Sequence, residues 1–107
     1  GRAQVRVVTL SSRLEEHLLD IRKDDTLQNS YSFGSDLLNA FSAVLRSALT
    51  PLNERGIGPA LVLCKPELRS RVVALLRQLQ VGLMGVNSEE LEPNLLVEPI
   101  AVLDLGY

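Results

Sequence analysis

The sequence has a single cysteine, Cys64, no tryptophan and only four aromatic residues, two Tyr and two Phe, in 107 positions. One cysteine cannot form an internal disulfide or supply a Cys-rich zinc site, so a reducing compartment such as the cytosol is expected. Tyr31 and Phe33 are the only aromatic residues close together, and no basic residue flanks them. A base-stacking surface for nucleic acid is therefore not expected.

Charge blocks and long apolar runs are also lacking. The formal net charge is −2, from 11 basic and 13 acidic residues that are scattered along the chain. This pattern gives no electrostatic footprint for nucleic acid or for an anionic lipid surface. No apolar run approaches the ~18 residues needed to cross a bilayer, so we expect this chain to be soluble and not inserted in a membrane.

The length limits the number of domains to one. A chain of 107 residues can bury one hydrophobic core but not two. Residues 1–3 contain neither an initiator Met nor a signal-peptide pattern, and we expect them to be a linker or a remnant of cloning. Residues 4–107 are expected to form a single α/β domain.

The first half of the chain predicts a strand followed by two helices. Residues 4–10 are rich in β-branched side chains and predict a strand. Ser11 or Ser12 can cap a following helix, expected over about 12–22, and Ser12 with Glu15 has the spacing of a capping box.

A polar tract and a long helix come next. Residues 24–34 are rich in Asp, Asn, Ser and Gly, so we expect this tract to be the most mobile connection. Apolar residues at a 3.6-residue period predict a helix from 35 to about 50, where Pro51 is expected to limit its extension.

The second half predicts strand, helix and two further strands. Residues 60–64 are continuously apolar, which is typical of a strand covered on both faces. Pro66 should open a helix that ends at Gln80. A third strand is expected over 81–86, with Met84 as ordinary core filler.

The last strand follows a capped turn. Asn87 and Glu90 have the spacing of an N-terminal cap over a short helical turn. Residues 95–105 predict the last strand, in which Pro99 should lie at a sheet edge or at a β-bulge.

Together these elements predict an α/β fold in the order β-α-α-β-α-β-β. A right-handed crossover should place strands 60–64 and 81–86 parallel. We expect one compact layer sandwich, with three main helices and a mixed sheet of three or four strands.

Three segments carry a family resemblance: Val8-Thr9-Leu10-Ser11-Ser12-Arg13-Leu14-Glu15, Pro59-Ala60-Leu61-Val62-Leu63-Cys64-Lys65-Pro66-Glu67-Leu68-Arg69, and Gly85-Val86-Asn87-Ser88-Glu89-Glu90-Leu91. In this order they resemble the C-terminal cytoplasmic region of the export-gate proteins of bacterial type III secretion and flagellar assembly. Ser11 stands at the family's usual capping Asp. Lys65 stands where the family prefers Ser, and the third segment matches more loosely.

The resemblance implies a non-enzymatic structural and interaction subdomain with no cofactor and no metal. It implies a larger protein in the bacterial inner membrane, whose cytoplasmic half forms a nine-fold ring of identical copies. That ring would receive chaperone–substrate complexes, contact other export-apparatus proteins and take part in switching between substrates. This chain would be the last subdomain on the cytoplasmic face, and the family's chaperone-docking groove lies upstream of it.

Two alternatives come from other classes of protein. Cys64 precedes a predicted helix N-terminus, where the helix dipole can lower a thiol pKa, so a small α/β enzyme with Cys64 as nucleophile is one. A phosphatase loop, however, needs an arginine six residues later, where Ser70 stands, and His17 belongs to no recognisable catalytic motif. The other alternative is an unrelated regulatory interaction domain.

Two arginines are the candidate partner contacts, Arg71 and Arg77. Arg71 also lies four residues after Glu67, which predicts an i,i+4 pair on a solvated helix face. Gly82 and Gly85 do not match a phosphate-binding loop, because no glycine-rich run precedes a helix.

Overall fold

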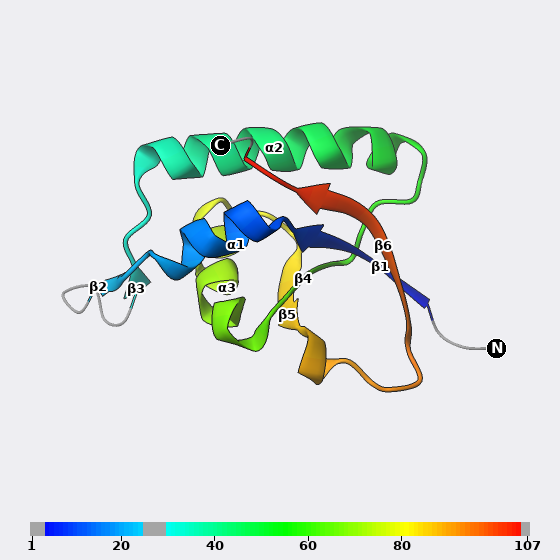
Figure 1. Cartoon of the computed structure of the whole chain (residues 1–107). Coiled ribbons are helices and arrows are strands. Elements are labelled where there is room, and N and C mark those ends of the chain that lie inside the picture. Colours follow the sequence, from blue (N-terminus) through cyan, green and yellow to red (C-terminus); the bar gives the residue numbers. More distant parts are fainter. Residues whose placement is uncertain (1–3, 25–29, 106–107) are drawn as a thin grey trace.

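The computed structural model describes residues 4–24 and 30–105, and the predicted linker at residues 1–3 lies outside them. The helices and strands, shown in Figure 1, are β1 (Gln4–Leu10), α1 (Ser12–Leu19), β2 (Lys23–Asp24), β3 (Ser30–Tyr31), α2 (Ser35–Glu54), β4 (Leu61–Cys64), α3 (Arg69–Gln78), β5 (Met84–Asn87) and β6 (Leu96–Leu103). Two 3-10 turns, Pro66–Leu68 and Ser88–Glu90, precede α3 and follow β5. The predicted fold class and the order of the main elements are confirmed.

The main sheet has four strands in the order β5-β4-β1-β6. All its neighbouring pairs are parallel, including the predicted pair β4 and β5. The sheet is therefore parallel throughout and not mixed, because every connection between its strands returns the chain to the same end. Antiparallel pairing occurs between β2 and β3, which form a separate two-stranded sheet.

Pro99 lies on an edge strand and next to a β-bulge, the two kinds of position at which it was expected. β6 is an edge strand, and its register with β1 shifts after the pair of Val7 and Pro99, so that Val8 is opposite Ala101. Ile100 is thus the extra residue of a bulge. An edge or a bulge is where a strand tolerates a residue that has no N–H group.

One core joins all three helices to one face of the sheet. Alternate positions of β1, β4 and β6 supply the strand side of this core, and they are Val8, Leu10, Val62, Cys64 and Leu103. The helices supply residues at helical spacing, among them Leu14, Leu18, Phe41, Leu45, Val72 and Leu75. On the other face of the sheet, Met84 and Val102 are 65% and 62% exposed.

The helix starts agree with the sequence more closely than the helix ends. Ser11 is the N-cap of α1, and its Oγ accepts from the N–H of Leu14 at 3.2 Å. The helix ends at Leu19, three residues before the predicted end. Pro66 opens the second helical segment as expected, first as a 3-10 turn and then as α3.

The predicted end of α2 at about residue 50 is wrong, because the helix runs through Pro51 to Glu54. Proline costs most in a helix interior, where it removes a hydrogen bond and collides with the preceding turn. Pro51 lies in the last turn, which is closed after it by bonds from the N–H of Arg55 to the carbonyls of Pro51 and Leu52.

The polar tract that was expected to be the most mobile connection contains two core residues. Residues 25–29 lie outside the described residues. Tyr31 and Phe33 are each 8% exposed and belong to the core, with ring centroids 6.2 Å apart. The end of the tract nearest α2 is therefore packed, which corrects the expectation for these residues.

Candidate interaction groove between α3 and β5

Cys64 is a packing residue at the end of β4. Its side chain is 6% exposed, and its Sγ donates to the carbonyl of Val86 at 3.6 Å. Burial, reinforced by the charge of Glu90, raises the pKa of the thiol to about 11. A thiol nucleophile would need a lowered pKa, and the pKa of Cys64 is raised instead. The cost of removing the thiolate from water outweighs the favourable effect of the helix N-terminus that follows.

Arg71 is used inside the domain. Its Nε donates to the carbonyl of Ile21 at 3.1 Å, its Nη1 donates to the carbonyl of Glu67 at 3.3 Å, and its guanidinium lies 5.1 Å from the centre of the Tyr31 ring. The predicted i,i+4 contact with Glu67 exists, but it reaches the backbone and not the carboxylate. These contacts hold the β3 segment on α3, so a partner role for Arg71 remains a prediction.

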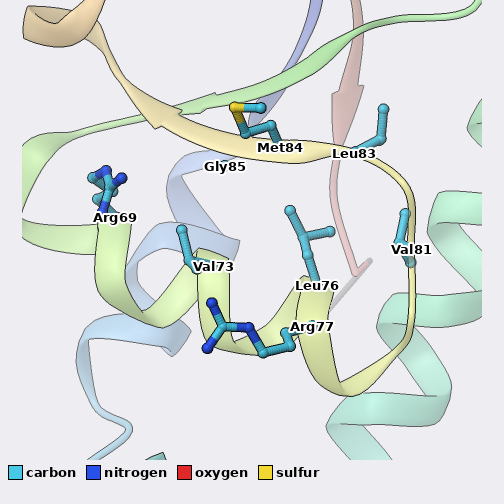
Figure 2. A pocket seen from close by; sticks show the side chains of 8 residues that line it. All are labelled: Arg69, Val73, Leu76, Arg77, Val81, Leu83, Met84 and Gly85. Atoms are coloured by element: carbon cyan, nitrogen blue, oxygen red, sulfur yellow. The ribbon is translucent and has the colours of Figure 1, made fainter.

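Arg77 lies at a groove between α3 and the edge strand β5 (Figure 2). The groove has a volume of about 320 Å³. Its lining is mostly apolar and includes two arginines of α3; it consists of Arg69, Val73, Leu76, Arg77, Val81, Leu83, Met84 and Gly85. The structure thus brings Arg77 together with Arg69, and not with Arg71.

Gly85 lets β5 lie close against α3. A Cβ at this position would come within 3.0 Å of a Val72 methyl and 3.2 Å of a Val73 methyl. A glycine inside a predicted strand often marks such a close approach of backbone, and this was the signal in the sequence that could have located the groove.

Met84 is on the groove's rim and not in the core, so its prediction as core filler is wrong. In Figure 2 its side chain stands on the side of β5 away from α3, and it is 65% exposed. Strand alternation explains this, because Gly85 faces the helix and its neighbour must face the opposite side.

The side of the groove at Arg69 is held by a capped turn. Asn87 and Glu90 form the predicted capping box, with Asn87 Oδ1 accepting from the N–H of Glu90 at 3.2 Å and Glu90 Oε1 accepting from the N–H of Asn87 at 2.9 Å. The same carboxylate oxygen pairs with Arg69 Nε at 2.5 Å. The bond from the Asn87 N–H, with help from Arg69, keeps the pKa of Glu90 below its ordinary range.

Arg77 carries an unused charge. Within the described part of the chain, the Arg77 guanidinium has no hydrogen bond or ion pair. Arg77 can therefore attract an anionic group to the apolar groove without first breaking a contact inside the domain. The residues that line the groove include no nucleophile and no acid–base pair.

In residues 4–24 and 30–105, no group of three or more His, Cys, Asp or Glu side chains could hold a metal ion. Nor is any helix in this part of the chain both long and apolar enough to span a bilayer.

Comparisons with known proteins define the fold. No protein-family model matches the sequence, and no curated protein matches it either. The structure is similar to that of the CdsV protein of Chlamydia pneumoniae, with a TM-score of 0.75 and 18% sequence identity over 97% of this chain. It is also similar to the nonameric SctV-C of EPEC, with a TM-score of 0.70 and 15% identity over 94% of this chain.

This likeness establishes a shared fold with part of both proteins. The chain spans 29% of the length of each of these structures. Both neighbours are cytoplasmic domains of type III secretion export gates, which is the class that the three sequence segments resemble.

Proposed function

We propose that residues 4–107 are the last cytoplasmic subdomain of an export-gate protein in a bacterial type III secretion or flagellar export apparatus. The observation that carries the proposal is the agreement of two independent signals. Three sequence segments resemble the family in the right order, and the structure is similar to part of CdsV over 97% of this chain, with a TM-score of 0.75.

In this role the domain acts by binding and not by catalysis. The buried Cys64 thiol, with its raised pKa, is poorly suited to be a nucleophile. The larger protein would sit in the inner membrane with this domain on its cytoplasmic face. It would assemble into a ring of nine copies, receive chaperone–substrate complexes and contribute to substrate switching. A ring of nine is supported by the nonameric state of SctV-C.

Secretion in the bacterium that carries the gene is the test. Deleting the codons for residues 4–107 in frame should abolish export of type III or flagellar substrates, while immunoblotting shows the rest of the protein still in the inner membrane. Arg46→Ala, an exposed change on α2, serves as the matched control and should export normally. Normal export by the deletion strain would contradict the proposal.

Ring formation is tested separately by electron microscopy of the longer protein's cytoplasmic region. Nine-membered rings are expected, and a stable assembly with another number of copies would contradict that part of the proposal.

A further inference from the structure

We propose that the groove between α3 and β5 binds an extended acidic segment of a partner protein, which adds as a strand to the open edge of β5 and places two carboxylates at Arg69 and Arg77. The groove would bind such a segment whether or not the chain belongs to an export-gate ring, because only α3, β5 and the turn between them form it.

The two edges of the sheet differ in their protection against strand addition. Edge strands are usually blunted by charge, proline or a bulge. β6 has all three devices, in Glu98, Pro99 and the register shift beside them. β5 has the sequence Met-Gly-Val-Asn, which carries none of them, and in the described part of the chain it pairs only with β4.

Backbone groups of β5 are oriented for pairing. The N–H of Asn87 donates to Glu90 and Sγ of Cys64 donates to the carbonyl of Val86 on the β4 side. Because backbone groups alternate along a strand, Gly85 shares the outward direction of Asn87. The N–H and C=O of Gly85 are therefore the backbone groups that can hydrogen-bond to an added strand.

The spacing of the arginines sets the pattern of the partner. Arg69 and Arg77 are eight residues apart on one helix, which is about 12 Å along its axis. A strand covers that distance in about four residues. The partner should therefore carry Asp or Glu at positions i and i+4, with an apolar residue at i+2 on the same face, above Val73 and Leu76.

Both arginines can take a carboxylate. Arg77 has no polar partner of its own in residues 4–24 and 30–105. Arg69 uses Nε for Glu90, and a guanidinium has five N–H donors, so others remain for a ligand. The charge and the apolar lining together favour an acidic strand over a basic or wholly apolar one.

The probe is a fluorescein-labelled peptide, Thr-Glu-Thr-Val-Thr-Glu-Thr, titrated with the 107-residue chain at low salt and followed by fluorescence anisotropy. Saturable binding is expected, with the amide signal of Gly85 among the most shifted in nitrogen–proton NMR spectra. Replacing both Glu by Lys in the peptide should abolish binding.

Arg77→Ala should weaken binding about two- to fivefold, as expected for one exposed ion pair. Arg46→Ala, which removes an exposed arginine on α2, is the matched control and should bind as the wild type does. Arg77→Glu should bind a peptide in which only the Glu that faces position 77 is replaced by Lys better than it binds the original peptide.

Backbone pairing is tested without changing the protein. Two peptides N-methylated at alternate positions, one on odd and one on even residues, should differ, because only one set of N–H groups faces β5. Equal binding of these two peptides, equal effects of Arg77→Ala and Arg46→Ala, or no saturable binding would each overturn the proposal. If two copies of the chain associate through β5 and this association competes with the peptide, the choice of partner would be overturned, and a second copy of the chain would be the occupant.

Discussion

The environment of Cys64 decides its chemistry. Burial raises the pKa of this thiol from an ordinary 9.0 to about 11. At neutral pH it should therefore carry about a hundredfold less thiolate than an ordinary cysteine, and thiolate is the reactive form. Iodoacetamide should modify Cys64 slowly in the folded chain and rapidly in urea. Equal rates in both states would revive the alternative of a cysteine enzyme.

The same pKa shift predicts a dependence of stability on pH. The folded pKa is the higher one, so the folded state holds the proton more tightly. The contribution of Cys64 is complete below about pH 9 and is lost as the pH rises to about 11. The difference in unfolding free energy between the wild type and Cys64→Ala, measured by urea titration, should narrow over that range. A constant difference would contradict the shift.

Lys65 is the N-cap before Pro66 and makes no side-chain capping bond. Its Nζ lies 4.0 Å from Glu15 Oε2, and its side chain is 64% exposed, so this ion pair contributes little. Lys65→Ser supplies an acceptor for the free N–H groups and should stabilise the domain by roughly 0.5 to 1.5 kcal/mol.

The control for that change is Lys65→Ala, which removes the ion pair and adds no cap. In denaturant titrations at unchanged m-value, Lys65→Ala should be neutral or slightly destabilising. If Lys65→Ser is no more stable than Lys65→Ala, the cap is not the limiting feature of this helix start.

Single residues with a local partner could be predicted from the sequence. The Asn87 and Glu90 capping box is an example, because both groups belong to one turn. The contacts of Arg71 with Ile21 and Tyr31 could not be predicted, since they join positions 50 and 40 residues apart. The groove at Arg77 was missed for the same reason: it exists only where α3 meets β5.

At the scale of elements, the β3 segment is held on α3 by Tyr31. Its hydroxyl lies 2.7 Å from Ser70 Oγ, and its backbone carbonyl accepts from Gln78 Nε2 at 3.3 Å. Tyr31→Phe should cost about 1 kcal/mol of unfolding free energy, because one hydrogen bond is lost without a change of shape.

A double-mutant cycle isolates that bond. Ser70→Ala should remove the same interaction, so Tyr31→Phe and Ser70→Ala together should cost less than the sum of the two single changes. Additive costs from urea titrations would show that the hydroxyl pair does not hold the segment.

Strand direction was the main feature of the elements that local patterns left undetermined. The periodicity of residues 95–105 predicts a strand, but not its neighbour or its direction. In the structure β6 returns beside β1 in parallel, because the Ser88–Glu90 turn and the segment after it carry the chain back to the other end of the sheet. That return depends on a loop and not on the pattern of either strand.

At the scale of the molecule, the single core favours independent folding of the chain, whereas the open edge of the sheet could allow two copies to associate. The core joins side chains from all three helices and from β1, β4 and β6, which is enough for independent folding of a chain of this size. The open edge of β5, with Met84 65% exposed beside it, is the place where two copies could meet.

The isolated chain should nevertheless be a folded monomer at micromolar concentration. β5 is only four residues long, and two short strands pairing at their edges bury too little surface to hold a dimer. Sedimentation velocity should give one species of the monomer mass, with circular dichroism showing cooperative unfolding. If a stable oligomer forms instead, Met84→Lys distinguishes its origin, because a lysine at an exposed edge opposes strand pairing. An oligomer that survives Met84→Lys would place the self-association surface elsewhere and would contradict the prediction of a monomer, whereas one that Met84→Lys disrupts would show that two copies pair through β5.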